Sequence, residues 1–568
     1  MKKARFFAGL TGLATLLGVM ALIGVSHAGP QGRFVYQPER GQPPLSGAAD
    51  YRLMTATGPD VTGQPAPLAA TDDIQVNGEN KADPNNQFGS GAGFPQNETS
   101  IAINPTDPLN VIGGANDYEY AVDSIGGVYA SFDGGHTWPY STHIPTVITP
   151  DRDWLGSGDP AVTFDTEGVA YYATINFARS TCDSWIAVSR SVNKGVNWTA
   201  PVGSESIGTG LQVGDGIVAH NGGDDDCQIF HDKEYIAAGP RPEGAPLVPG
   251  TDLEHLSPDR VYVTWTVFDF GPAGDTYLES PIVVAYSDDQ GRHWSAYQEI
   301  SGSAPFCHIQ SGDQDGDCDE DQFSVPVVDQ DTGDVYVAFL NYQYRSSTKI
   351  QYLVVRSSDG GQTWSGPFKV ANVVAGNYPT CPLTGSQTLD EMCARVNQGG
   401  NIDIDPTTGD LWITWSDNRN GSVSDTNTDV FVTRSTNGGS SWASVVNLTS
   451  QSDDDQWFPW LSVSPTGTVA VVYFDKRYAA GQKLYDASLS YSTDGGGSVV
   501  TVRLSEVSSN PDLTFRLGIF MGDYNGLDTT ASTALPFWAD GRSGEPPVRG
   551  NNPYRPQSDV VTDVEPIA

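Results

Sequence analysis

Short runs of alternating apolar and polar residues recur along most of this chain. In NIDIDPTTGDLWITWSDNRNG (401–421), the alternation appears in IDI and again in LWITW, and the turn DPTTGD separates the two runs. Strict alternation is typical of half-buried strands, and two such runs around a short turn predict a β-hairpin. Similar hairpins are predicted at 100–118, 160–177, 324–342, 460–478 and 518–542, and an interrupted one at 234–270. The pattern therefore predicts an all-β protein.

A second pattern, S-x-D-x-G-x-x-W, follows six of these seven hairpins. An aspartate at the third position can accept hydrogen bonds from backbone amides of its own turn, glycine tolerates the positive φ of such a turn, and the tryptophan anchors it. Six copies in register predict a repeat architecture. The copies are SFDGGHTW (131–138), SVNKGVNW (191–198), SDDQGRHW (287–294), SSDGGQTW (357–364), STNGGSSW (435–442) and STDGGGSV (492–499), with Asn193 and Asn437 in place of aspartate and Val499 in place of tryptophan.

These eight-residue segments are Asp boxes, and from about residue 72 to its end the chain resembles the sialidase-like, or BNR-repeat, β-propeller superfamily. The resemblance implies that each box joins the third and fourth strands of a blade. It also implies that the boxes lie on the face away from the binding site. Ser131, Asp133 and Trp138 are therefore expected to be structural.

Seven hairpins and six boxes predict a seven-bladed propeller, with six blades as the alternative. The last hairpin is followed by SDVVTDVEPI (558–567), a third strand, but by no fourth strand. Upstream of the first blade, DIQVN (73–77) resembles the fourth-strand segment VVNLTS (445–450). We expect this N-terminal strand to complete the last blade and close the ring, because closure removes exposed sheet edges.

The N-terminal sequence predicts that the protein is exported. Residues 1–28 combine a basic start, an apolar run and small residues before Gly29, which is typical of a cleaved secretory signal; an uncleaved cell-surface anchor is the alternative. Residues 29–71 are rich in Pro, Gly and Ala and are expected to be a flexible lead-in to a propeller at 72–568. The mature protein is expected to be a secreted monomer without a membrane segment.

Charge and cysteine content fit this picture. The net charge of −39 excludes nucleic acid as a partner and disfavours anionic membranes. Six cysteines in an exported chain indicate disulfides, and six allow 15 pairings. The sequence-local choice is 182–227, 307–318 and 381–393, each expected within one inter-strand loop.

The start of each innermost strand is a candidate for chemistry, because these segments surround the central channel of a propeller. They place six carboxylates near one ring, where they could form a polar or cation-binding mouth. The alternative is that they cap the innermost strands. The six are Glu98, Asp159, Asp232, Asp321, Asp455 and Asp523.

The resemblance assigns roles to some of these residues. Sialidases use a tyrosine nucleophile paired with a glutamate, an aspartate acid/base and an arginine triad for the substrate carboxylate. Tyr524, Glu98 and Asp159 match the first three roles, and Asp523 adjoins Tyr524. The family's first-strand Phe/Tyr-Arg-Ile-Pro motif is absent, because the matching stretch reads NETSIAIN.

Three D-x-R segments end second strands and could supply a carboxylate clamp through Arg419, Arg477 and Arg542. The alternative is that these arginines form structural bridges with the aspartates two residues earlier. Nearby aromatic residues, Trp457 and Trp460 among them, are candidates for stacking on sugar rings.

The segment DQDGDCDED (313–321) offers alternating carboxylates suited to Ca²⁺, although it is not an EF-hand loop. A solvated acidic loop is the alternative. The candidate ligands are Asp313, Asp315, Asp317, Asp319 and Asp321, and no motif for an organic cofactor is present.

Two functions remain open on the sequence. The first is a glycoside hydrolase that acts on extracellular glycans through carboxylates at the channel mouth. The second is a non-catalytic extracellular scaffold, stabilised by calcium, that binds a glycan or a protein.

Overall fold

The computed structural model describes residues 43–46, 73–77, 94–118, 124–147, 156–178, 182–202, 216–221, 227–272, 274, 276–307, 316–342, 350–479, 483–542 and 557–567. The described residues form β-strands joined by loops and four short 3₁₀ helices, and they contain no α-helix. The predicted signal (1–28) and most of the lead-in (29–71) lie outside these residues. None of the described helices is long and apolar enough to cross a membrane.

Six antiparallel four-stranded sheets follow one another along the chain, each with its strands in sequence order. Blade 1 contains β2 (Gln96–Ile103), β3 (Val111–Asp117), β4 (Ile125–Ser131) and β5 (Tyr140–His143). Blade 2 contains β6 (Gly156–Phe164), β7 (Ala170–Ala178), β8 (Asp183–Ser191) and β9 (Ile217–His220). Blade 3 contains β10 (Ile229–Pro240), β11 (Asp259–Asp269), β12 (Ile282–Ser287) and β13 (Gln298–Glu299).

The next three blades have the same order. Blade 4 contains β14 (Asp321–Val328), β15 (Val335–Asn341), β16 (Ile350–Ser357) and β17 (Ser365–Val373). Blade 5 contains β18 (Ile402–Ile404), β19 (Leu411–Asp417), β20 (Asp429–Ser435) and β21 (Val446–Asn447). Blade 6 contains β22 (Gln456–Val463), β23 (Val469–Asp475), β24 (Asp486–Ser492) and β25 (Val500–Arg503). The 3₁₀ helices are η1 (Leu253–His255), η2 (Arg477–Ala479), η3 (Pro511–Leu513) and η4 (Arg516–Gly518).

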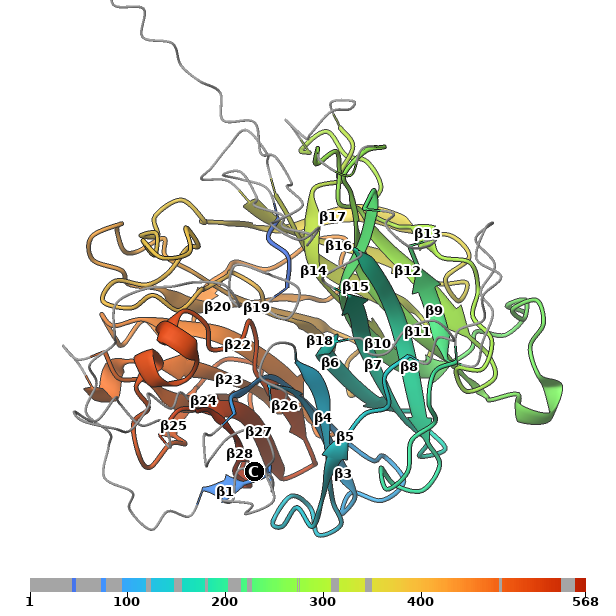
Figure 1. Cartoon of the computed structure of the whole chain (residues 1–568), viewed down its shortest axis with the longest axis horizontal. Helices are drawn as coiled ribbons and strands as arrows, with labels where there is room; N and C mark the ends of the chain where they lie inside the picture. Colours follow the sequence, from blue (N-terminus) through green and yellow to red (C-terminus); the bar gives the residue numbers. More distant parts are fainter. Residues whose placement is uncertain are drawn as a thin grey trace, which may run out of the picture.

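The seventh blade is built from both ends of the propeller. Its strands are β26 (Gly526–Thr529), β27 (Thr533–Asp540), β28 (Asp559–Thr562) and, at the outer edge, β1 (Ile74–Gln75), while β29 (Glu565–Pro566) pairs with β27. Ile74 lies opposite Thr562 and Gln75 opposite Val561 in the antiparallel pair (Figure 1). The prediction that an N-terminal strand completes the last blade is confirmed, and the six-bladed alternative is excluded.

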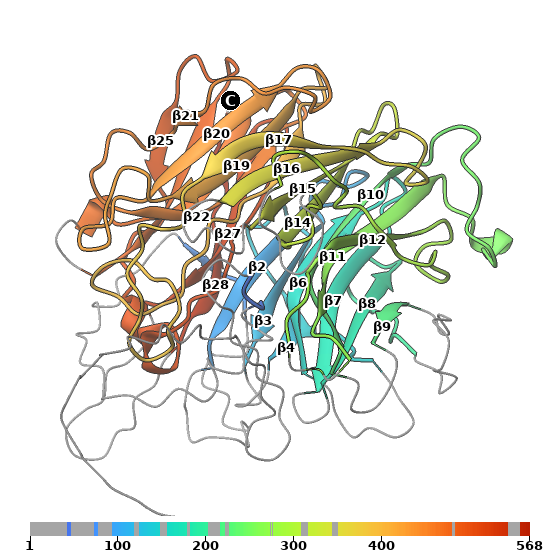
Figure 2. The same ribbon diagram turned by 90° about the horizontal axis from the view of Figure 1, so that it is seen from above.

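The first strand of every blade faces the central axis. Consecutive inner strands contact one another in the order β2, β6, β10, β14, β18, β22 and β26, and β26 contacts β2, so the ring is closed. Figure 2 shows the outer strands β9, β21 and β25 far from β2 and β14. The ring therefore brings seven chain segments, widely separated in the sequence, to one axis.

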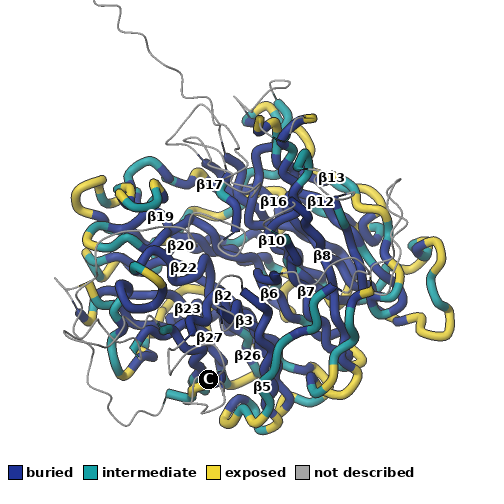
Figure 3. The backbone as a smooth tube through the Cα atoms, viewed as in Figure 1, coloured by how far each residue is buried: buried dark blue, intermediate teal, exposed yellow. Residues whose placement is uncertain are grey.

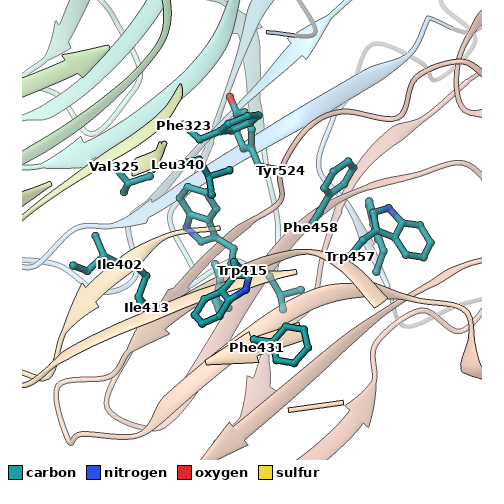
Figure 4. Close-up of a cluster of buried hydrophobic side chains, with 14 of the residues drawn as sticks. Phe323, Val325, Leu340, Ile402, Ile413, Trp415, Phe431, Trp457, Phe458 and Tyr524 are labelled. Atoms are coloured by element: carbon teal, nitrogen blue, oxygen red, sulfur yellow. The ribbon is translucent and has the colours of Figure 1, made fainter. Parts of the chain in front are cut away.

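Apolar side chains fill the spaces between blades, as the strand pattern requires. The largest buried cluster extends across blades 4 to 7 and includes Trp415, Trp457 and Trp538. Figure 3 shows this burial concentrated in the strands, with exposed residues in the outer loops. Trp415 lies beside Phe431, with the ring centroids 5.9 Å apart (Figure 4).

The Asp boxes join the third and fourth strands, as the resemblance implied. In the first box, the Ser131 hydroxyl donates to Asp133 (2.8 Å) and accepts from the amide of Gly135 (3.0 Å). The amide of Thr137 donates to Asp133 (2.8 Å), and Trp138 Nε1 donates to the carbonyl of Gly135 (3.0 Å). Gly135 has φ 94°, which explains why glycine is needed there.

All three sequence-local disulfides are present: Cys182–Cys227, Cys307–Cys318 and Cys381–Cys393. The last two each close one connection between neighbouring blades. The expectation that every pair lies within one inter-strand loop is wrong for Cys182–Cys227, because Cys182 precedes β8 and Cys227 precedes β10. This disulfide therefore ties blade 2 to the connection that enters blade 3.

Candidate functional site

A recurrent bulge in the inner strands presents side chains at the channel mouth. In blade 1, the pairing register of the inner strand β2 against β3 shifts between Asn97 and Ser100. The inner strands of blades 2, 3, 4 and 6 show the same shift at the matching place. Each bulge holds a non-glycine residue with positive φ, an arrangement that is uncommon and strained. These five residues are Glu98 (φ 55°), Asp159 (56°), Lys233 (55°), Phe323 (62°) and Phe458 (51°). The same backbone bulge thus presents acidic, basic and aromatic side chains from five blades.

Asp523 is the most strongly held carboxylate at this mouth. Arg395 Nε donates to its Oδ1 (3.1 Å), Arg395 Nη2 pairs with its Oδ2, and Asn397 Nδ2 donates to Oδ1 (3.2 Å). Lys233 Nζ lies 3.7 Å from Oδ2. Asp523 precedes β26, whereas Arg395 and Asn397 precede β18 and Lys233 lies on β10. The carboxylate therefore links three blades.

Glu98 and Asp159 come from the adjacent blades 1 and 2, and Asn116 on β3 lies between them. Asn116 Nδ2 donates to Glu98 Oε2, and Asn116 Oδ1 accepts from the backbone amide of Asp159 (2.8 Å). Glu98 and Asp159 are both at most 1% exposed. The amide of Asn116 therefore fixes the two acidic residues relative to each other.

The surroundings raise the pKa values of Glu98 and Asp159 but lower that of Asp523. Burial, reinforced by the neighbouring Asp159, raises the pKa of Glu98 well above its usual range. Burial also raises the pKa of Asp159. Burial acts in the same direction on Asp523, but the Arg395 and Lys233 cations outweigh it and hold the pKa of that carboxyl below its usual value. These directions favour the protonated form of Glu98 and the ionised form of Asp523, and the charge of Asp523 contributes to raising the pKa of Glu98.

Tyr524 is brought to the same place but remains a neutral phenol. Its hydroxyl donates to the carbonyl of Pro160 (3.3 Å), and Lys233 Nζ lies 4.2 Å from the centre of its ring. Burial, followed by the nearby Glu98 and Asp159, raises the pKa of Tyr524 well above its usual value. The raised pKa values favour the protonated forms of Glu98 and Tyr524, and this does not suit Glu98 as a base for this tyrosine.

Two further carboxyl groups line the mouth from β10. Asp232 Oδ2 accepts from Gln322 Nε2 (3.1 Å) and from the backbone amide of Ser46 (2.7 Å), and burial, followed by Asp159, raises its pKa to about 7. Glu234 is 1% exposed, and its carboxylate oxygens have no hydrogen-bond partner within the described part of the chain. Burial raises the pKa of Glu234 well above its usual range.

The remaining predicted mouth carboxylates serve other contacts. Asp321 accepts from Asn341 on the neighbouring strand (2.8 Å). Asp455 accepts from the amide of Thr428 (2.9 Å) and pairs with Lys476 (3.3 Å), so it links blades 5 and 6. For these two residues the strand-capping alternative describes what is observed.

The three D-x-R arginines each pair with the aspartate two residues earlier: Arg419 with Asp417 (2.5 Å), Arg477 with Asp475 (2.5 Å) and Arg542 with Asp540 (2.7 Å). Arg542 also pairs with Asp73 (2.5 Å), next to the closing strand. These are the contacts expected of structural bridges.

Trp457 lies in the core. It is 1% exposed and packs against Phe474, with the ring centroids 5.7 Å apart (Figure 4). Stacking on a sugar ring would require this part of the core to open.

The calcium prediction is untested by these contacts. Asp313 and Asp315 lie outside the described residues, while Asp317, Asp319 and Asp321 lie within them. Across the described ranges, no group of three or more His, Cys, Asp or Glu side chains is placed to hold a metal ion. At the channel mouth, Lys233 and Arg395 supply the positive charge that balances the carboxylates.

Sequence reasoning missed these two cations and Asn397. The segments HDKEY (231–235) and RVNQGG (395–400) were both recognised as inner-strand starts, but only Asp232 of the first was given a role at the mouth and no residue of the second was. A basic residue among predicted buried acids was the available signal, because a buried acidic cluster needs compensating charge.

Comparison with known proteins shows distant similarity to several solved structures. No protein-family model matches the chain, and no curated protein matches it. Similar solved structures include a protein of unknown function from Dyadobacter fermentans DSM 18053, at 14% identity over 88% of this chain and 99% of that one, with a TM-score of 0.42. An alpha-L-arabinofuranosidase from Fusarium graminearum has 10% identity over 87% and 98% of the two chains, with a TM-score of 0.40.

The intramolecular trans-sialidase from Ruminococcus gnavus has 14% identity over 88% of this chain and 98% of that one, with a TM-score of 0.37. The propeller assignment itself rests on the blade order, the ring closure and the Asp-box geometry seen directly in this chain. Together these features agree with the sialidase-like resemblance drawn from the boxes.

Proposed function

We propose that this protein is a secreted glycoside hydrolase that acts on extracellular glycans through the carboxyl groups of the channel mouth. The observation that carries the proposal is the presence, at one channel mouth, of two buried carboxyl groups whose pKa values shift in opposite directions, Glu98 and Asp523. Glycosidases need one protonated and one ionised carboxyl group at the same bond. The three disulfides fit an exported protein.

In this mechanism, Glu98 gives its proton to the leaving-group oxygen of the glycosidic bond. Asp523, held ionised by Arg395, stabilises the positive charge that develops on the sugar ring. Water then bonds to the ring carbon that has lost the leaving group, and its proton passes to the Glu98 carboxylate, which restores the acid. Asp159 lies beside Glu98, and its negative charge raises the pKa of Glu98, so it favours the return of the proton to Glu98. Tyr524 remains a neutral phenol and does not act as a nucleophile. Its hydroxyl instead orients neighbouring groups through hydrogen bonds. This assignment departs from the tyrosine nucleophile of sialidases.

The test is turnover of a panel of aryl glycosides, including a sialoside, by the purified mature protein, with calcium and with a chelator. Glu98→Gln is expected to lower kcat/KM by about 10²- to 10⁴-fold, the usual contribution of a general acid. Asp133→Asn, in an Asp box, is the matched control and should retain activity, because asparagine stands naturally at the same place in two boxes. A Glu98→Gln protein with wild-type turnover would exclude Glu98 as the acid.

A non-catalytic scaffold is the second candidate. It is favoured by the full engagement of Asp523 with Arg395 and Asn397, which ties blade 7 to blade 5 as a structural bridge does. Silence of the wild-type protein across the panel, together with retained binding to an immobilised glycan or protein, would favour this candidate.

A further inference from the structure

A short piece of the N-terminal lead-in lies in the channel mouth. Residues 43–46, with the sequence PPLS, are described, and they lie near β14 in Figure 1. Pro43, Leu45 and Ser46 are buried, and Leu45 is only 3% exposed. Leu45 belongs to the buried apolar cluster of blades 2 and 3. A segment expected to be a flexible lead-in is therefore partly ordered against the site.

The backbone of this segment is bound by three different blades. The amide of Ser46 donates to Asp232 Oδ2 on blade 3 (2.7 Å), and the carbonyl of Pro44 accepts from Gln322 Nε2 on blade 4 (2.9 Å). The carbonyl of Leu45 accepts from Arg395 Nη1 (3.0 Å), in the connection that enters blade 5. All three protein groups belong to the mouth, and Arg395 also holds Asp523. The segment therefore occupies hydrogen-bonding groups that a bound ligand would otherwise meet.

We propose that residues 43–46 are a detachable plug: an internal peptide ligand that fills the channel mouth and must leave before a substrate can reach Glu98 and Asp523. The contacts suit such a role, because backbone hydrogen bonds and one apolar side chain are the usual means by which extended peptides bind. Two prolines limit the freedom of the unbound segment, so less entropy is lost on docking.

The tether determines how the plug competes. Residues 47–73 connect it to β1, so release leaves the segment attached to the propeller. A tethered ligand has an effective concentration on the order of millimolar, so a weakly bound plug remains in place until a substrate or a cut in the tether removes it. The effect on turnover rests on the proposed hydrolase function, whereas the plug itself does not.

Hydrogen exchange of the full-length mature chain tests the plug. In the wild-type protein, the amide of Ser46 should exchange well below the unfolded-chain rate, because it is buried and bonded to Asp232. Leu45→Asp should speed this exchange by about tenfold or more, since a charged side chain cannot occupy the apolar site. Leu45→Met, which keeps size and polarity, is the matched control. Exchange at the unfolded-chain rate in the wild type would overturn the proposal.

A second measurement does not depend on exchange. A fluorescent peptide of sequence GQPPLSGA, residues 41–48, should bind the Leu45→Asp protein and show at least about tenfold weaker binding to the wild type, whose own segment occupies the site. A peptide with aspartate in place of leucine should bind neither. Equal binding of the GQPPLSGA peptide to both proteins, or binding to neither, would overturn the plug.

Measurement of glycoside turnover distinguishes a failure of the plug proposal from a failure of the hydrolase proposal. If Leu45→Asp frees the segment and raises turnover of the glycoside panel, both proposals are supported. If it frees the segment while both proteins remain silent on the panel, the plug is supported and the hydrolase proposal fails. If turnover is present and unchanged although the segment is free, the plug does not block the site and this inference fails.

Discussion

Aspartate residues have two different roles in this propeller, one in the Asp boxes and the other at the channel mouth. In the boxes, the carboxylate accepts hydrogen bonds from its own turn: Asp494 accepts from the amide and the hydroxyl of Ser498, and these bonds lower its pKa to about 2. At the mouth, Asp523 depends on Arg395 and Asn397, more than a hundred residues away in the sequence. Burial dominates there and raises the pKa of most neighbouring carboxyl groups.

The difference shows how a repeat fold can carry a unique site. The boxes repeat because the hydrogen bonds that shape each turn, from the serine hydroxyl and to the third-position side chain, close within eight residues. Five blades have a bulge at the same place in the inner strand, but the side chains there differ in chemistry, from acidic Glu98 to basic Lys233 and aromatic Phe458. Repetition therefore marks local structural need, and departure from repetition marks the place where chemistry is assembled.

Removing a cation at the mouth should have the largest effect on stability. Arg395→Leu leaves Asp523 buried without its main partner, and loss of one member of a buried pair costs about 3–5 kcal/mol. Urea unfolding of the wild type and the variant measures this loss as a change in the free energy of unfolding. Lys194→Ala, which removes the exposed partner of Asp107, is the control and should leave the unfolding midpoint unchanged. Equal effects of the two substitutions would contradict the contrast between buried and exposed pairs.

The pH dependence of stability should separate a box aspartate from a buried aspartate outside the boxes, Asp528 on β26, which accepts a hydrogen bond from the amide of Ile103 on β2 (2.7 Å). Burial raises the pKa of Asp528 to about 6, so the folded state binds its proton more tightly than the unfolded state does. Its contribution is therefore fully present below about pH 4 and is lost as the pH rises through about 6, by about 3 kcal/mol in all. Asp528→Asn should abolish this slope in the difference curve obtained from urea unfolding between pH 4 and 8.

A box aspartate should show the opposite slope. Burial acts to raise the pKa of Asp133, but hydrogen bonds from Thr137 and Ser131 outweigh it and lower the pKa. Its contribution is present above about pH 4 and is lost as the pH falls through the lowered value. Difference curves of the same sign for Asp133→Asn and Asp528→Asn would refute this distinction.

The smallest effect is expected within a single box. Asp359 accepts from the hydroxyls of Ser357 and Thr363 and from the amides of Gln362 and Thr363. Asp359→Ala should lower the free energy of unfolding by about 1–2 kcal/mol, because these donors lose their acceptor. Asp359→Asn should cost far less, since an asparagine oxygen accepts the corresponding bonds at Asn193 and Asn437. Thermal unfolding measures both, and an equally large loss in the asparagine variant would mean that charge, not hydrogen bonding, holds the turn.

Much of this molecule was accessible from local patterns. The boxes gave the third-to-fourth-strand turns, the alternating hairpins gave seven blades, and the resemblance of DIQVN to a fourth strand gave the closing pair with β28. The three disulfides joined the sequence-local pairs, although Cys182–Cys227 spans more than one loop. Glu98, Asp159, Asp523 and Tyr524 were placed at one mouth, and the structure brings them together.

The sequence by itself determined the repeat, the blade number, the ring closure and the set of acidic residues at the inner-strand starts, because each follows from spacing or from turns that satisfy their own hydrogen bonds. Only the tertiary structure decided that Arg395 and Lys233 hold Asp523, that burial raises the pKa of Glu98 and that residues 44–46 bond to residues of the mouth. These features depend on burial and on charges contributed by different blades. A carboxyl group's acidity is set by the groups that surround it in space, and the ring brings those groups together from opposite ends of the chain.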